Sequence, residues 1–182
     1  MKKKIFIAIN LPEGIKKKLE FSQERISRSF NDFCPIKWTR TDNLHITLFF
    51  IGYVNIEELV DIFNKVETVA EKFSPFSVKM EKIAYGPKGK SPKMVWVEGK
   101  ESSEMTKMNK ELEKIILGIS GESKQFIPHI TLGRIIQWQF RKIEPDENPD
   151  ISEDVSISFV IDSLDIMESV KGGYDILKSI KL

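Results

Sequence analysis

The chain has only two histidines, and both open the same tetrapeptide, HITL, at His45 and at His129. In an extended strand, residues i and i+2 lie on the same face. His45 and Thr47 should therefore point one way, with the apolar residues between and after them pointing into the protein, and His129 and Thr131 should repeat this arrangement. The pattern predicts two strands that each present an imidazole and a hydroxyl on one polar face.

Two imidazoles and two hydroxyls that converge on one cleft suit the hydrolysis of a phosphodiester. Histidine, with an ordinary pKa of about 6.5, can serve as base or as acid near neutral pH. One ring would take a proton from water while the other protonates the leaving oxygen, and threonine hydroxyls would donate to the non-bridging oxygens. A single strand histidine more often has a packing role, and threonine is a common strand former. The interpretation therefore depends on the repetition of the motif in a matching strand context.

A metal site is the other chemistry that two histidines suggest. A catalytic zinc site generally has three protein ligands at recognisable spacing, and no acidic residue stands at such spacing from His45 or His129. The single cysteine, Cys34, excludes both a thiolate zinc cluster and a disulfide within the chain. We therefore expect neither a metal nor another cofactor.

The elements that must position these residues can be predicted from hydrophobic periodicity. Short apolar or alternating runs predict strands at 4–11, 43–52, 76–86, 93–100, 127–136, 155–169 and 174–182. Apolar residues at helical spacing predict helices at 14–30, 56–73 and 102–120. Each HITL motif therefore stands in a strand that follows a helix.

The order of these elements indicates an internal repeat, approximately over residues 4–92 and 93–182. Each half runs strand, helix, HITL strand, connection and hairpin, and no linker rich in Gly or Ser separates the halves. Hairpins and short connections favour antiparallel sheets. We predict one bilobal α+β domain over 1–182, with two pseudo-symmetric antiparallel sheets, helices on their outer faces and a central cleft.

Composition limits the classes of partner and location. The 28 basic and 27 acidic side chains give a net charge of +1, which does not suggest a strongly cationic protein that covers long duplex nucleic acid. The first apolar stretch, residues 5–9, is too short for a secretory signal. No window approaches the roughly 20 apolar residues of a membrane span. We expect a cytoplasmic monomer with no membrane partner.

The two HITL motifs and their surroundings resemble the 2H phosphoesterase superfamily, defined by paired H-x-[ST]-h motifs in which h is apolar. Within it, the sequence is most similar to the RNA 2′,3′-cyclic phosphodiesterase family, also labelled 2′-5′ RNA ligases. The likeness to that family's opening strand and helix, two motifs and closing hairpin extends over KIFIAINLPEGIKKKLE, IKWTRTDNLHITLFFIG, FIPHITLGR and SLDIMESVKGGYDIL. One departure is Lys4, where the family usually has Arg, which keeps the charge but loses the bidentate fork.

The resemblance implies a LigT-like fold with its cleft between two lobes. It implies His45 and His129 as the acid/base pair, and Thr47 and Thr131 as donors to phosphate oxygens. It also implies that Arg134 neutralises phosphate charge or holds the nucleotide. On a straight strand Arg134 would point away from His129, so this role requires the strand to bend near Gly133.

The activity implied by the resemblance is metal-independent hydrolysis of a 2′,3′-cyclic phosphate at an RNA 3′ end, which yields a 2′-phosphomonoester. Run backwards, the same site could join a cyclic phosphate to a 5′-hydroxyl as a 2′-5′ RNA ligase without ATP. The residues alone leave open which histidine is the base, while the resemblance implies His45 as the acid and His129 as the base. The expected partners are RNA 3′ ends or nucleoside 2′,3′-cyclic phosphates.

Recognition of a single-stranded end would use aromatic rings that stack on bases. Phe6 and Phe49 share the parity of the polar-facing positions and are candidates, with core packing as the alternative for each. Trp38 and Trp96 have the same two interpretations. Three other functions stay open: a phosphodiesterase for another cyclic nucleotide or a 2′-5′ oligonucleotide, a nucleotide- or RNA-binding module without turnover, and a structural protein.

Overall fold

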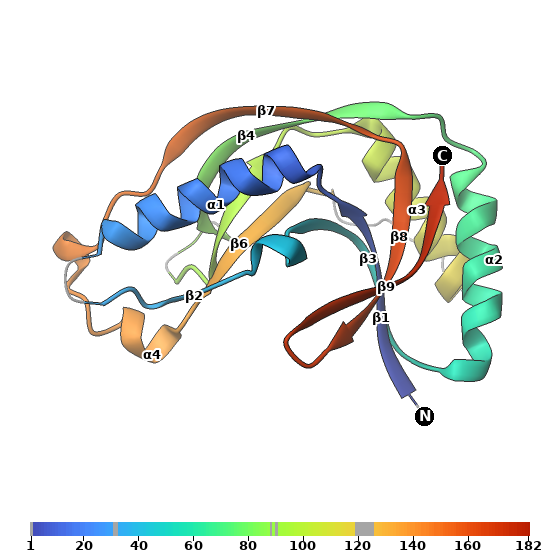
Figure 1. Ribbon diagram of the computed structural model, residues 1–182, viewed down its shortest axis with the longest axis horizontal. Coiled ribbons are helices and arrows are strands. Elements are labelled where there is room, and N and C mark those ends of the chain that lie inside the picture. The colour runs from blue at the N-terminus through green and yellow to red at the C-terminus, as the bar shows by residue number, and fades with distance from the viewer. Residues whose placement is uncertain (1, 31–32, 88, 90, 119–125) are drawn as a thin grey trace.

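The computed structural model describes residues 2–30, 33–87, 89, 91–118 and 126–182 (Figure 1). The strands are β1 (Lys2–Asn10), β2 (Ile36–Trp38), β3 (His45–Asn55), β4 (Phe76–Gly86), β5 (Met94–Gly99), β6 (His129–Ile135), β7 (Glu153–Ile161), β8 (Ser163–Val170) and β9 (Gly173–Lys181). The helices are α1 (Glu13–Arg28), α2 (Leu59–Ala70), α3 (Ser103–Leu117) and α4 (Gln137–Phe140), with 3₁₀ turns η1 (Thr41–Asn43), η2 (Ile56–Glu58) and η3 (Pro145–Glu147).

All strand pairs in the described residues are antiparallel and follow the order β7-β4-β5-β6-β3-β1-β8-β9, with β2 paired to β6 beside this path. The sheet consists of two four-stranded halves that meet where β3 pairs with β6, at Ile46 and Ile130. In each half the HITL strand lies at this junction, next to the strand that leads into a helix, β1 before α1 and β5 before α3. The predicted α+β class with antiparallel strands is confirmed, but the two predicted sheets are one continuous sheet, because β3 pairs with β6.

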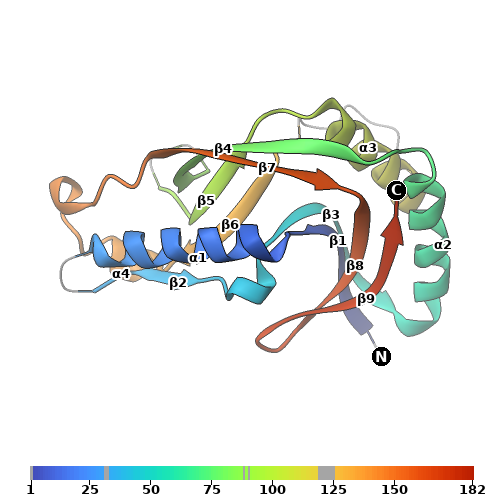
Figure 2. The same ribbon diagram turned by 45° about the horizontal axis from the view of Figure 1, so that its top comes forward.

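Apart from the excursion to β2, the chain crosses twice between the two halves of the sheet. Strand β4 joins the half of β5 and β6, whereas β8 and β9 join the half of β1 and β3. The prediction of one strand over 155–169 is wrong, because the chain turns at Asp162 and continues as β8 beside β1 (Figure 2). Side chains alternate between exposed and covered along β7, whereas β8 runs through the core from Leu164. The division of the repeat near residue 92 stays a prediction.

Helices cover both halves of the sheet. Helix α1 packs beside β6, while α2 and α3 pack on each other and against the half that contains β3, β8 and β9 (Figure 1). Two helical segments begin at capped N-termini: Ser102 accepts a hydrogen bond from the backbone of Met105 at 3.2 Å, and Asn55 forms a capping box with Glu58. None of the helices in the described part of the chain has the length and apolar character that crossing a bilayer requires.

The buried face of α1 contains polar side chains among its apolar ones. Leu19 and Ile26 lie in the core at 1% and 4% exposure, and Lys16 and Gln23 lie on the same stripe at 4% and 6%. A buried polar side chain costs free energy unless it is hydrogen-bonded. One partner of Gln23, the carbonyl oxygen of Leu132, belongs to the strand that bears His129, so this stripe leads directly to the candidate site.

Candidate active site

The two HITL motifs lie on neighbouring antiparallel strands at the centre of the sheet. Because Ile46 pairs with Ile130, the same register places His45 opposite Thr131 and Thr47 opposite His129. Each imidazole therefore faces the hydroxyl of the other motif, around a local twofold axis near the Ile46–Ile130 pair. The isoleucines themselves are fully buried on the opposite side of the strands.

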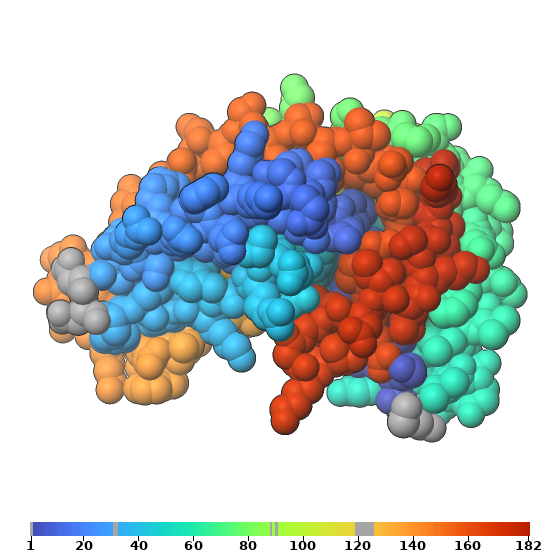
Figure 3. Space-filling model, in the orientation of Figure 1, coloured from blue at the N-terminus to red at the C-terminus, as the bar shows by residue number. Residues whose placement is uncertain are grey.

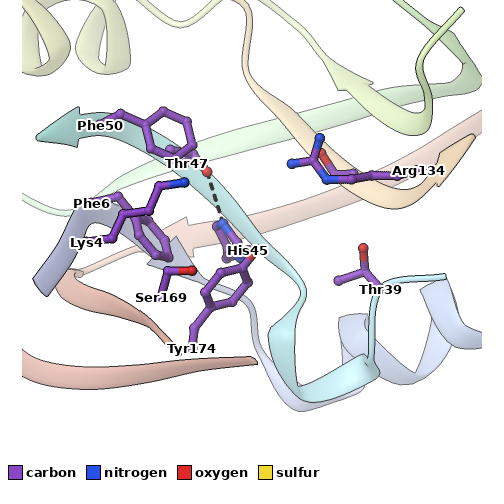
Figure 4. A pocket seen from close by; sticks show the side chains of 10 residues that line it. Lys4, Phe6, Thr39, His45, Thr47, Phe50, Arg134, Ser169 and Tyr174 are labelled. Atoms are coloured by element: carbon purple, nitrogen blue, oxygen red, sulfur yellow. Dashed lines mark hydrogen bonds between the residues drawn. The ribbon is translucent and has the colours of Figure 1, made fainter. Parts of the chain in front are cut away.

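Both imidazole rings are oriented by the same kind of backbone contact. His45 Nδ1 lies 2.7 Å from the carbonyl oxygen of Asn43, and His129 Nδ1 lies 3.0 Å from that of Ile127. A carbonyl can only accept, so each Nδ1–H donates and each Nε2 is left for the cleft side. His45 Nε2 lies 2.9 Å from Thr47 Oγ1, and in the neutral ring it accepts from that hydroxyl (Figure 4).

The surroundings of the two histidines differ. Aromatic rings enclose His45, with Phe6 at 5.3 Å and Tyr174 edge-on at 5.0 Å between centroids, whereas His129 packs on Trp96 at 4.9 Å. Burial lowers the pKa of His45 from its ordinary value. The hydrogen bond to the Asn43 carbonyl raises this pKa, but by less than burial lowers it. The positive charges of His129, Arg134 and Lys16 lower this pKa further. In the free site His45 is therefore neutral at neutral pH.

Each HITL strand has a β-bulge at its leucine. In the ladder with β1, Thr47 and Phe49 oppose consecutive residues and Leu48 is the extra one. In the ladder with β5, Thr131 and Gly133 oppose consecutive residues and Leu132 is the extra one. Because the bulge adds one residue, it brings the fifth position after each histidine to the same face as the histidine.

The two bulges decide which side chains reach the cleft. Arg134, the fifth residue after His129, lines the cavity, so the bend expected near Gly133 is present. At the equivalent place in the other motif, core packing is the interpretation that fits Phe49, while Phe50 lines the cavity with 63% of its surface exposed. The predicted alternation held up to Thr47 and failed because of the extra residue. Phe6 lines the cavity but is only 2% exposed, since it packs around His45.

A side-chain amide from a helix caps the carbonyl oxygen of each bulge. Gln23 on α1 donates to the carbonyl oxygens of Leu132 and Thr39, both at 2.8 Å, and the backbone N–H of Thr39 donates to the same Leu132 oxygen at 2.8 Å. In the other half, Asn109 on α3 donates to the carbonyl oxygen of Leu48 at 2.6 Å. The polar residue in the buried stripe of α1 is thus explained, because it holds the bulge that directs Arg134.

Glycine is needed where β2 covers the second bulge. A Cβ on Gly133 would lie 2.5 Å from Ile36 Cγ2 and 2.9 Å from Trp38 Cε3, so any larger residue would push β2 away. Of the two interpretations of the tryptophans, packing fits Trp38, and Trp96 packs while also backing the His129 ring.

The polar face of both strands opens into a cavity of about 180 Å³. Figure 4 shows His45, Thr47 and Lys4 on one side of it, facing Arg134 and Thr39 on the other. Its lining consists of Lys4, Phe6, Thr39, His45, Thr47, Phe50, Thr131, Arg134, Ser169 and Tyr174. His129 is not among these lining residues, but it shares the face of Thr131 and its charge acts on His45.

Besides Phe50, three lining residues were not singled out for a role from the sequence: Thr39, Ser169 and Tyr174. Ser169 and Tyr174 stand in the closing hairpin, where only the resemblance drew attention to them, and Thr39 had no sequence signal. In the described part of the chain, no three His, Cys, Asp or Glu side chains are grouped as ligands for a metal ion. The cavity offers the ring nitrogen of His45, the hydroxyls of Thr47 and Thr131 and the cations of Lys4 and Arg134 to one small anionic group.

Comparison with known proteins finds relatives among the RNA 2′,3′-cyclic phosphodiesterases. The profile described as LigT like Phosphoesterase matches residues 9–96. An RNA 2′,3′-cyclic phosphodiesterase of Archaeoglobus fulgidus is 31% identical over 133 residues, which are 72% of this chain and 72% of that protein. One of Thermotoga maritima is 29% identical over 170 residues, which are 90% of this chain and 85% of that protein. The crystal structure of Escherichia coli LigT complexed with NADP+ has the same fold, with a TM-score of 0.74 at 19% identity, over 100% of this chain and 99% of that one.

Proposed function

Because the chain belongs to the LigT-like phosphoesterases, enzymes that hydrolyse phosphodiester bonds, we propose that it hydrolyses RNA 2′,3′-cyclic phosphate termini to 2′-phosphomonoesters. The observation that carries this proposal is the crossed arrangement of His45 and Thr47 with Thr131 and His129 on paired strands. The relatives from Archaeoglobus fulgidus and Thermotoga maritima are named for this activity, which supports it.

The proposed reaction uses one histidine on each side of phosphorus. His129 Nε2 takes a proton from water, whose oxygen attacks phosphorus, and the bond from phosphorus to O3′ breaks. His45 Nε2–H gives its proton to O3′, so that the products are a 3′-hydroxyl and a 2′-phosphomonoester. The backbone carbonyls that hold each Nδ1–H fix both rings with Nε2 available for these transfers.

The acid role requires a proton on His45 in the substrate complex. Burial and neighbouring cations keep the pKa of His45 low in the free site. A bound phosphate anion reverses part of this effect, because an opposite charge nearby favours the protonated ring. The substrate itself therefore helps to protonate the acid that acts on it.

The remaining polar residues of the cavity are suited to the charge of the phosphate. Thr47 and Thr131 hydroxyls would donate to the non-bridging oxygens, and the Arg134 guanidinium would balance their charge. Lys4 adds a second cation on the opposite side (Figure 4). The ring of Phe50, exposed beside these groups, is the surface on which the terminal base would stack.

The same geometry would permit the reverse reaction, in which a 5′-hydroxyl takes the place of water and a 2′-5′ linkage forms. Hydrolysis is favoured in dilute solution because water is in large excess over any 5′-hydroxyl. The monomeric state and the cytoplasmic location stay predictions from the sequence.

The direct test is the conversion of an RNA oligonucleotide that ends in a 2′,3′-cyclic phosphate, in the presence of a chelator. Chromatography should resolve a 2′-phosphate product rather than a 3′-phosphate. His45→Ala and His129→Ala should each lower the rate by roughly 10²–10⁴-fold, the usual scale for loss of a proton-transfer group. Lys110→Gln, on the exposed side of α3, is the control and should retain activity.

Other outcomes would separate the alternatives. Turnover only of another cyclic nucleotide or of a 2′-5′ oligonucleotide would indicate the sibling activity. Binding without product at any pH, unaffected by His45→Ala, would indicate a binding module and would refute the proposed reaction.

A further inference from the structure

A second cavity, of about 330 Å³, opens beside the candidate active site. Strand β2 and the loop after it form one wall, and the turn between β8 and β9 forms the other. Figure 3 shows this face of the molecule notched where the red β8–β9 hairpin approaches the cyan segment. The residues that line both cavities are Thr39, Arg134, Ser169 and Tyr174. A molecule bound in the first cavity can therefore extend directly into the second.

Two cations lie side by side on the wall of this second cavity. Lys37 on β2 pairs with Arg134 on β6 in the antiparallel ladder, so both side chains project from the same face. Both side chains are exposed. Like charges directly opposite each other on a sheet are destabilising.

Within the part of the chain that the structure describes, no acidic side chain relieves the repulsion between Lys37 and Arg134. Among the residues that the structure describes, no carboxylate is within salt-bridge distance of Lys37 or Arg134, and none lines the cavity. Arg40 adds a positive charge to the lining, partly offset by the exposed Asp42 carboxylate at 3.8 Å. An anion between Lys37 and Arg134 would convert an unfavourable pair into a favourable cluster.

We propose that this second cavity binds the phosphodiester that links the terminal nucleotide of the RNA to the one before it, with Lys37 as its cation. The inference rests on the proposed function, because a cyclic phosphate held between Thr47 and Thr131 fixes where the terminal ribose lies. The next negative charge of an RNA strand is one nucleotide upstream, and the second cavity shares Arg134 with the first. Lys37 thus lets the protein distinguish an RNA end from a free nucleoside 2′,3′-cyclic phosphate, which has no second phosphate.

The experiment compares two substrates, a nucleoside 2′,3′-cyclic phosphate and a trinucleotide that ends in the same cyclic phosphate. The quantity of interest is the ratio of their kcat/KM values in the unmodified protein, in Lys37→Gln and in the control Lys110→Gln. Lys37→Gln should lower the ratio, trinucleotide over mononucleotide, by about 3–10-fold, while Lys110→Gln should leave it unchanged. The slope of log(kcat/KM) against log[salt] for the trinucleotide should become shallower by about 0.7, the value for one phosphate contact to a single strand.

Each outcome bears on the proposal. An unchanged ratio and salt slope in Lys37→Gln would overturn it, as would an equal loss on both substrates. If neither substrate is turned over, the proposed function fails, and the subsite is then tested by fluorescence anisotropy with a trinucleotide that ends in a 2′-phosphate. In that case Lys37→Gln should weaken binding of the trinucleotide more than that of the nucleoside 2′-phosphate, and equal affinities for the variant and the unmodified protein would refute the subsite.

Discussion

Replacement of Gln23 by Met should damage a site to which Gln23 contributes no atom. The substitution keeps the length of the side chain and its fit in the core, where Gln23 is 6% exposed, but removes both N–H donors. The carbonyl of Thr39 loses its amide partner, while that of Leu132 keeps the backbone N–H of Thr39. The bulge that brings Arg134 into the cavity is then held by one hydrogen bond fewer.

The size of this effect follows from the two lost contacts. A typical hydrogen bond contributes a net 0.5–1.5 kcal/mol, so the loss of two should lower the free energy of unfolding of Gln23→Met by about 1–3 kcal/mol. In a domain of this length each kcal/mol shifts Tm by about 2–4 °C, which predicts a decrease of about 2–12 °C. A misplacement of Arg134 by about 1 Å should lower kcat/KM by up to about 10²-fold.

Two controls separate positioning from loss of stability. Rates are measured well below the Tm of the variant, with Ser22→Ala on the same helix as the matched substitution, which should leave kcat/KM unchanged. If Gln23 acts through Arg134, the effect of Gln23→Met on kcat/KM should shrink when Arg134 is already Ala. Full activity in a folded Gln23→Met protein, or an undiminished effect in the Arg134→Ala background, would refute the reasoning.

Three further predictions concern the other half of the site. Phe50→Ala should weaken binding of an RNA end by about 1–3 kcal/mol in a fluorescence titration, the usual value of one base stacked on an aromatic ring. An equal or larger loss of binding in a folded Phe49→Ala protein would contradict the bulge at Leu48. Asn109→Leu should lower Tm, because the Leu48 carbonyl loses its donor at 2.6 Å; an unchanged Tm would argue against the clamp. The pKa of His45 is lowered in the folded state. As the pH decreases below the unfolded value of about 6.5, the unfolded chain therefore binds a proton before the folded protein does, and the free energy of unfolding decreases. Thermal melts of His45→Asn should therefore depend less on pH than those of the unmodified protein between about pH 7 and the folded pKa, and identical profiles would contradict the shift.

Strand alternation was sufficient to predict which residues of the two motifs share a face, but only as far as each strand is regular. His45 with Thr47 and His129 with Thr131 fall on one face because no irregularity separates them. Beyond the leucine the rule fails, since a bulge leaves no distinct mark in a run such as LFFIG; this is why Phe49 was chosen over Phe50.

Other features depended on contacts between segments far apart in the sequence. The alternation of apolar and polar residues continues through Asp162, so the sequence predicted one strand over 155–169. In the structure the chain passes at Asp162 from β7 in one half of the sheet to β8 in the other. Gln23 was visible as a polar residue within an amphipathic helix, yet its partners lie on β6 and in the loop after β2. Sequence periodicity describes single elements, whereas the cavity is formed by residues from β1, β3, β6, β8 and β9 together.

The central claim is that both imidazoles share one phosphate site, and the chain permits a direct measurement because it has only two histidines. An NMR pH titration of the two ring Cε1–H signals, assigned with His129→Asn, reports each ring separately. In the free protein His45 should titrate below its ordinary pKa, and addition of a nucleoside 2′-phosphate should raise the pKa of His45 and move the ring signals of both histidines. If the ligand binds and only one ring responds, or neither does, the two histidines do not face a common phosphate.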